Sequence, residues 1–255
     1  MTNSKGFNKI LRYNAVRNHP AISKLGGDIM SNEVIWLGFA IINFILMVTS
    51  YKLFGKYGLL TWIAMGTILA NIQVVKMVEL FGMTATLGNI MFGTLFLATD
   101  TLNEKYGLKA ARSSVFIGFF TLISTVIIMQ VALQFTSAGD GVVQSALETI
   151  FGLMPRIALA SLTAYLVSQL LDVYLFQKIK TALPANNLLF ARNLGSTLIS
   201  QLIDSLIFVP IAFLGVVSGS ILWEIIFTTY VIKLIVAALD TPFIYLMKRI
   251  QPLKI

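Results

Sequence analysis

Long apolar runs, separated by short polar segments rich in Lys and Arg, follow one another along most of the chain. A helix that crosses the ~30 Å hydrocarbon core of a membrane needs about 20 mostly apolar residues. Seven segments meet this requirement, and the third is the most polar because it contains Gly88, Gly93 and Asp100. The seven are 34–54, 59–79, 86–102, 114–135, 155–177, 194–217 and 222–247.

The pattern within these runs favours helices over strands. They lack the apolar–polar alternation of membrane β-barrels, and backbone groups in lipid have to be bonded within the segment itself. The sequence therefore predicts an all-α, polytopic transmembrane helix bundle with about seven spans. It divides into a basic N-terminal tail (1–33), a transmembrane domain (34–248) and a short basic C-terminal tail (249–255). The longest connection, 136–154, predicts an interfacial helix, or alternatively a gate over the outer mouth.

The composition agrees with a membrane protein. The 255 residues are 57% hydrophobic and 12% charged, with a mean hydropathy of +0.84, whereas soluble domains carry about 25% charged residues. The chain has no cysteine, which excludes disulfides and thiolate metal sites. A net charge of +8 would also suit nucleic-acid binding, but a basic stripe on a soluble scaffold is missing. We expect no metal, no cofactor and no nucleic-acid partner.

The basic residues predict an orientation. Eleven Lys and Arg fall in alternate loops, and the opposite loops contain none, although Arg156 lies just inside the next span. The positive-inside rule makes the basic side cytoplasmic, so the C-terminus lies inside and the N-terminus outside. The basic N-terminal tail conflicts with this orientation, and the conflict disappears if 34–54 lies on the membrane instead of crossing it. The eleven are Lys52, Lys56, Lys105, Lys109, Arg112, Lys178, Lys180, Arg192, Lys248, Arg249 and Lys254.

Two ionisable residues, Asp204 and Lys233, lie near mid-bilayer on consecutive predicted spans. Charges at this depth are costly, face the bundle interior and usually mark a transport pathway. We predict that they form an ion pair and line a substrate cavity, with Gln201 one turn away on the same face. The alternative is a structural ion pair that fixes the helix register. Lys76 and Glu79, near an outer end, are interpreted as snorkelling to the headgroups.

A short sequence occurs twice. Residues 168–176 read SQLLDVYLF and residues 200–208 read SQLIDSLIF. Consecutive spans run in opposite directions, so the copies would form an inverted pair, and such repeats often bracket the midplane site of a transporter. Gln169 and Asp172 share one helix face in the first copy. Chance similarity, and an interfacial position for Asp172, are the alternatives.

Asp100 and Glu104 lie four residues apart at the inner end of the third span, just before Lys105, Lys109 and Arg112. We interpret them as an inner gate whose charges exchange partners between states. The alternative is a helix-end cluster that only sets the topology. Asn71 adds a polar amide to the second span.

Residues 92–112, FGTLFLATDTLNEKYGLKAAR, resemble the signature of the bacterial queuosine precursor transporter family. The signature residues here are Asp100, Glu104, Tyr106, Gly107 and Arg112. The resemblance covers roughly 70–248, which implies a six-span family core plus one extra N-terminal span.

The resemblance implies uptake of 7-cyano-7-deazaguanine or 7-aminomethyl-7-deazaguanine across the bacterial inner membrane. The partners would be a nucleobase-like small molecule and the lipid bilayer, with a homo-oligomer or an energising subunit left open. Independently, a carboxylate suits the donor edge of a guanine-like base, and aromatic rings suit its faces. The candidate substrate-binding or translocation residues are Asp204, Gln201, Lys233, Gln169, Asp172, Asp100, Glu104 and Asn71.

Two other functions compete with this interpretation. A substrate-binding membrane module of an ATP-driven importer would take its energy from a partner, since no phosphate-binding G-x-x-x-x-G-K-[ST] loop is present. An intramembrane enzyme usually needs His, Cys, an activated Ser or a metal cluster. The predicted spans contain no His or Cys, so we expect no enzyme.

Overall fold

The computed structural model describes residues 31–74, 76–138, 141–152, 154–184, 188–215 and 219–253. Most of the predicted basic N-terminal tail (1–33) lies outside the described residues, as does Lys254 of the C-terminal tail. The helices are α2 (Asn32–Val74), α3 (Asn89–Tyr106), α4 (Leu108–Ala132), α5 (Val142–Leu147), the π-helix η1 (Glu148–Gly152), α6 (Met154–Ala182), α7 (Leu189–Phe213) and α8 (Gly219–Arg249). The only strands in these ranges, β1 (Met77–Leu80) and β2 (Met83–Thr86), form one antiparallel hairpin.

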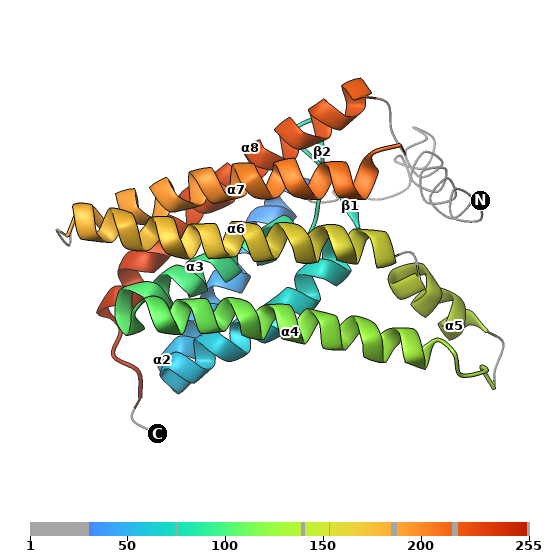
Figure 1. Cartoon of the computed structure of the whole chain (residues 1–255), viewed down its shortest axis with the longest axis horizontal. Coiled ribbons are helices and arrows are strands. Elements are labelled where there is room, and N and C mark those ends of the chain that lie inside the picture. The colour runs from blue at the N-terminus through green and yellow to red at the C-terminus, as the bar shows by residue number, and fades with distance from the viewer. Residues whose placement is uncertain are drawn as a thin grey trace.

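The predicted all-helical bundle is confirmed (Figure 1). Among the described residues, five helices are long and apolar enough to cross a membrane, namely α2, α4, α6, α7 and α8. α2 contains the first two predicted segments in two arms, and α3 is the shorter, more polar third segment. A helix is therefore present at every predicted segment, while the number of membrane crossings stays a prediction.

The two arms of α2 meet at Gly55, which has φ 57° and ψ −131°. Glycine adopts a positive φ without steric cost. Asn32 at the start of α2 donates to the carbonyl of Glu79 at 3.1 Å, and Glu33 accepts from the backbone N–H of Phe81 at 3.0 Å. Since the end of α2 leads into the same hairpin, both ends of this 43-residue helix lie together. The arms therefore fold back on each other.

The prediction of the second segment, 59–79, is wrong at its C-terminal end. The helix stops at Val74, and Lys76 and Glu79 belong to the hairpin connection instead of the span. Phe81 and Gly82 form the two-residue hairpin loop, with φ values of 54° and 73°. Positive φ at both positions is typical of a type I′ turn, whose twist matches that of the flanking strands. β-Branched Val78, Thr84 and Thr86 favour strands on either side.

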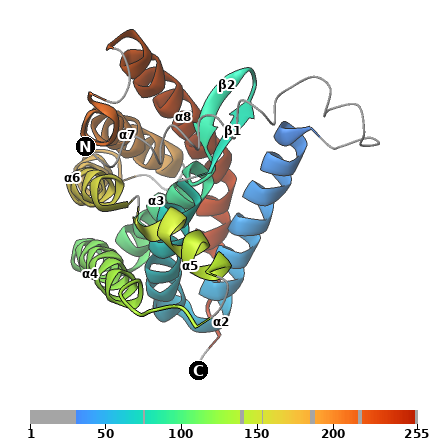
Figure 2. The same ribbon diagram turned by 90° about the vertical axis from the view of Figure 1, so that its right-hand side faces the viewer.

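Polarity in the bundle is reversed relative to a soluble protein. In α3, which lies among the other helices when the bundle is viewed end-on (Figure 2), 14 of 18 residues are buried, Asp100 among them. Large apolar side chains instead face outward, such as Phe120 at 72% and Ile128 at 64% exposure on α4. Apolar surface outside and carboxylates inside suit lipid as the surrounding solvent. This is a multi-pass membrane protein.

The first arm of α2 packs into the bundle like the other segments. Its buried residues Trp36, Ala40, Phe44, Met47 and Tyr51 recur at helical spacing, and the ring of Phe44 stacks on Phe243 of α8 at a centroid distance of 4.5 Å. Its other face is apolar and exposed.

The connection predicted as an interfacial helix contains α5 and η1, and no residue of either is buried. Gln130 of α4 donates to the carbonyl of Phe151 at 2.7 Å, and Gln144 donates to the carbonyl of Leu133 at 3.1 Å. These bonds hold the connection beside the end of α4. Its interfacial position stays a prediction.

The basic residues gather at one end of the bundle. The bend between the two arms of α2, the turn between α3 and α4, the end of α6 and the end of α8 lie on the left of Figure 1, and the hairpin and α5 lie toward the right. Ten of the eleven counted Lys and Arg belong to the described part of the left-hand end, whereas Lys76 and Arg156 lie near the other. With the corrected helix end, Lys76 belongs to the connection at the hairpin end, and the asymmetry between the two ends persists.

This asymmetry gives a prediction about topology. A cysteine introduced at Ser137 or Gly219 should react with an impermeant thiol reagent added outside intact cells, and one at Thr181 should react only after permeabilisation. All three positions are exposed, and the cysteine-free chain gives no background. The opposite labelling pattern would reverse the orientation.

A second prediction concerns the fold of α2. A Cβ atom added at Gly58 would lie 2.1 Å from the backbone oxygen of Ser50, whereas one at Gly38 would meet no atom within 4 Å. Overpacking of this kind typically costs about 1–3 kcal/mol. We expect Gly58→Ala to lower the thermal denaturation midpoint in detergent and Gly38→Ala to leave it unchanged or raised. Equal stability of the two variants would argue against the close packing at the bend.

Candidate functional site: a polar pathway through the bundle

The two copies of the repeated sequence face each other across α6 and α7. Ser168 donates to Asp204 Oδ1 at 3.0 Å, and Ser200 donates to Asp172 Oδ1 at 2.8 Å. The serine of each copy thus holds the aspartate of the other. Because α6 and α7 run in opposite directions, this reciprocal bonding is the inverted arrangement that the sequence predicted. It places Asp204 nearer the hairpin end and Asp172 nearer the basic end.

The predicted ion pair between Asp204 and Lys233 is confirmed. Lys233 Nζ of α8 contacts Asp204 Oδ2, and the two side chains are 6% and 14% exposed, respectively. With Ser168 on its other oxygen, the Asp204 carboxylate has a partner on each side.

A small, partly open cavity adjoins this pair, with about 330 Å³ of non-atom space when its open part is included. Its walls come from the end of α2, the start of α3 and the middle of α6, α7 and α8, so it lies in the half of the bundle nearer the hairpin. Two lining groups, Asn89 Nδ2 and Ser161 Oγ, are buried and have no hydrogen-bond partner among the residues described. The lining residues are Val74, Asn89, Phe92, Ser161, Ala164, Asp204, Phe208, Thr229 and Lys233.

Further toward the basic end, the interior holds Asp100 of α3, Asp172 of α6 and Asp240 of α8. Their exposed fractions are 0%, 0% and 1%. Ser200 bonds Asp172, and Asn193 Nδ2 donates to Asp240 Oδ1 at 2.8 Å. Asp100 is thus inside the bundle beside other carboxylates and not in a helix-end cluster at the surface.

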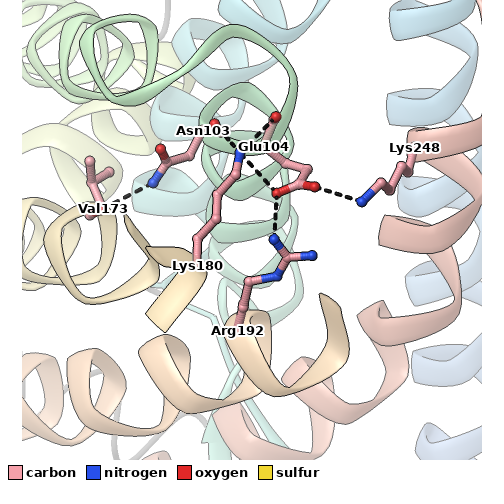
Figure 3. A network of polar contacts seen from close by, with 6 residues as sticks. All are labelled: Asn103, Glu104, Val173, Lys180, Arg192 and Lys248. Atoms are coloured by element: carbon pink, nitrogen blue, oxygen red, sulfur yellow. Dashed lines mark hydrogen bonds and ion pairs between the residues drawn. The ribbon is translucent and has the colours of Figure 1, made fainter. Parts of the chain in front are cut away.

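Glu104 lies one helical turn beyond Asp100 and binds three cations from three helices (Figure 3). Lys248 Nζ of α8 contacts Oε1 at 2.7 Å, while Lys180 Nζ of α6 and Arg192 Nη1 of α7 contact Oε2 at 3.1 and 3.3 Å. Asn103 adds a bond to the carbonyl of Val173 at 3.0 Å. This Glu104 network, formed by Glu104, Lys180, Arg192 and Lys248, joins α3, α6, α7 and α8 at the basic end.

The partners of Glu104 differ from the neighbours that the sequence suggested. Lys109 and Arg112 are exposed, and Lys105 donates to the carbonyl of Ile250 at 2.7 Å. The sequence predicts a loop position for Arg192, yet Arg192 lies in the first turn of α7 and is 1% exposed. A fully buried arginine needs a carboxylate partner, but neighbours in the chain do not reveal which one.

The remaining predicted site residues lie near the cavity or the reciprocal serine–aspartate bonds. Gln169 is fully buried and Gln201 is 2% exposed, each next to a serine of the reciprocal pair. Asn71 donates to the carbonyl of Thr67 at 2.9 Å and lies one turn from Val74 at the cavity. Asn89, Ser161 and Thr229 were missed, because a single small polar residue in an apolar helix gives no signal before its neighbours are known.

The inverted helix pair, the cavity on one side and the ion network on the other define a helical membrane transporter. The chain matches the family model described as "putative vitamin uptake transporter" over residues 86–247. It is 50% identical over 223 residues to the "probable queuosine precursor transporter" of Bacillus subtilis, covering 88% of this chain and 97% of that protein. The chain therefore belongs to the queuosine precursor transporter family, as the resemblance in 92–112 predicted.

Two further relatives carry the same description. The "queuosine precursor transporter" of Escherichia coli is 29% identical over 162 residues, which are 62% of this chain and 70% of that protein. The "probable queuosine precursor transporter" of Haemophilus influenzae is 33% identical over 101 residues, 39% of this chain and 41% of that protein. No solved structure matches the chain.

Proposed function

We propose that this chain imports a queuosine precursor, 7-cyano-7-deazaguanine or 7-aminomethyl-7-deazaguanine, across the bacterial inner membrane. The observation that carries the proposal is the cavity lined by Asp204, Lys233 and two phenylalanines. The 50% identity to the "probable queuosine precursor transporter" of Bacillus subtilis supports the choice of substrate. The N-terminus lies outside and the C-terminus inside, so the cavity is on the outer side. No catalytic role is proposed.

The cavity lining suits a small, flat base. Phe92 and Phe208 would pack on the two faces of the ring system. The Asp204 carboxylate would accept hydrogen bonds from the ring N–H and the amino group, and charge-assisted bonds of this kind are strong. Asn89 Nδ2 would donate to the ring carbonyl.

Binding of the base would change the partner of Lys233. In the structure Asp204 is bonded to Lys233 and Ser168, so a base that takes Asp204 would release the lysine. The Glu104 network closes the inner end in this state, and its opening would complete the pathway. Exchange of partners is the bistable element that alternating access needs.

The proposal is tested in cells that cannot synthesise the precursor. Expression of this chain should restore queuosine in tRNA at low concentrations of external base, and expression of Asp204→Asn should not. The Glu148→Gln variant, altered at an exposed position on η1, is the matched control and should behave as wild type. No gain over empty vector, with the protein detected in the membrane, would exclude the proposed function.

A further inference from the structure

Asp100, Asp172 and Asp240 come from three helices and interact with one another inside the bundle. The carboxyl groups of Asp100 and Asp172 lie within hydrogen-bonding reach of each other, and Asp240 interacts electrostatically with both. None is more than 1% exposed. Adjacent anions in a low-dielectric interior repel strongly and lose their hydration, so they do not coexist at this depth without compensation.

The buried cations near these three carboxylates pair with other acidic residues. Lys233 of α8 is paired with Asp204, and Lys180, Arg192 and Lys248 contact Glu104. The basic residues of the α2 bend and of α4 are exposed. The strongest electrostatic partners of Asp100 are other carboxylates, namely Asp172, Asp240 and Glu104. Around Asp172, α7 contributes the hydroxyls of Ser196, Thr197 and Ser200.

Unpartnered atoms within this cluster point to a ligand. Both carboxylate oxygens of Asp100 lack a hydrogen-bond donor among the described residues, although the side chain is fully buried. Asn193 reaches into the cluster through its bond to Asp240, and its own Oδ1 also lacks a partner in that part of the chain. An ionised carboxylate can only accept hydrogen bonds. Asp100 and Asp172 can therefore bond to each other only if one of them carries a proton.

The position of this pair is between the cavity and the Glu104 network. The reciprocal serine bonds place Asp172 four residues, about 6 Å, inward of Asp204 along the helix pair. Glu104 follows Asp100 by another four residues on α3. A proton held here would lie on the path from the outer cavity to the inner network.

We propose that Asp100 and Asp172 form a proton-binding site that couples transport to the proton gradient. One proton enters from the outer side with the substrate, is shared between the two carboxyl groups, and leaves to the cytoplasm when the Glu104 network opens. With the proton present the pair holds α3 against α6. After its release the two carboxylates repel each other, which favours the return to the other state. This inference rests on the proposed function.

The test uses the purified full chain in liposomes with labelled 7-cyano-7-deazaguanine. Exchange of labelled for unlabelled base at equal pH reports transport alone. Accumulation with the interior one pH unit more alkaline, at a membrane potential clamped to zero, reports coupling. One proton per substrate predicts up to about tenfold accumulation, since one pH unit is a tenfold ratio of proton activity. Asp100→Asn and Asp172→Asn should lose the accumulation, and Glu148→Gln should keep it.

The outcomes separate the two proposals. Absence of exchange by the wild-type protein would contradict the proposed function itself. Exchange without any effect of the pH gradient, or accumulation driven by a sodium gradient instead, would overturn the proton site while leaving the transporter intact. A pH-sensitive dye inside the liposomes gives a second readout on the wild-type protein. Substrate entry should acidify the interior by one proton per molecule, and entry without acidification would also contradict the proposal.

Discussion

Single substitution of Asp204 by Asn, or of Lys233 by Met, should abolish uptake and destabilise the protein. The two side chains are each other's charged partner in the bundle interior. Removing one partner of a buried ion pair leaves the other charge uncompensated, at a typical cost of about 3–5 kcal/mol. Thermal denaturation in detergent and uptake of labelled base into cells measure the two effects separately.

The double variant Asp204→Asn with Lys233→Met distinguishes a binding role from a structural one. The double variant leaves no uncompensated charge in the bundle interior, so its stability should return toward that of wild type. If Asp204 binds the base, uptake should stay below about 1% of wild type, because a neutral amide cannot accept both donors of the base edge. Normal uptake by the double variant would defeat the binding role. Additive losses of stability would defeat the pairing.

Substitution of Glu104 by Gln should open the inner end of the bundle. Glu104 is the acceptor for cations on α6, α7 and α8, and the network is the main set of ion pairs at that end of the described structure. The neutral amide of glutamine would lose the charge attraction to all three cations. We expect at least a tenfold fall in the uptake rate, because an inner end that does not close prevents the return to the outward-facing state.

Accessibility gives the direct readout of this change. A cysteine placed at Ser196, a fully buried position on α7, should be protected from a thiol reagent added to the cytoplasmic side. In the Glu104→Gln background the same cysteine should become reactive. Lys109→Gln removes a charge from an exposed position at the same end and serves as control. Continued protection of the cysteine in both backgrounds would show that Glu104 does not hold the inner end closed.

The helices and the central ion pair could be predicted because each depends on local or periodic information. Apolar runs of fixed length define the segments, and opposite charges at matched depth on consecutive helices identified Asp204 and Lys233. The repeated Ser-Gln-Leu-x-Asp sequence likewise indicated which faces of α6 and α7 would meet. Its exact contact, serine of one copy on aspartate of the other, follows from the antiparallel packing of the two helices.

The parts that sequence analysis missed depend on contacts between distant residues. Lys180, Arg192 and Lys248 have the sequence pattern of loop charges, and only the convergence of three helix ends on Glu104 makes them a network. The second segment is predicted to run to residue 79, into the first strand of the hairpin, because Met77 and Val78 continue the apolar run. Strand pairing across Phe81 and Gly82 competes with the helix there and prevails.

Exchange of labelled base by the purified protein tests the central claim most directly. Liposomes that contain this chain alone and are preloaded with unlabelled 7-cyano-7-deazaguanine should take up external labelled base without ATP or any ion gradient. The Asp204→Asn variant should show none of this exchange. Uptake no greater than that of empty liposomes, by protein shown to be folded and inserted, would contradict the account that this bundle is itself the transporter.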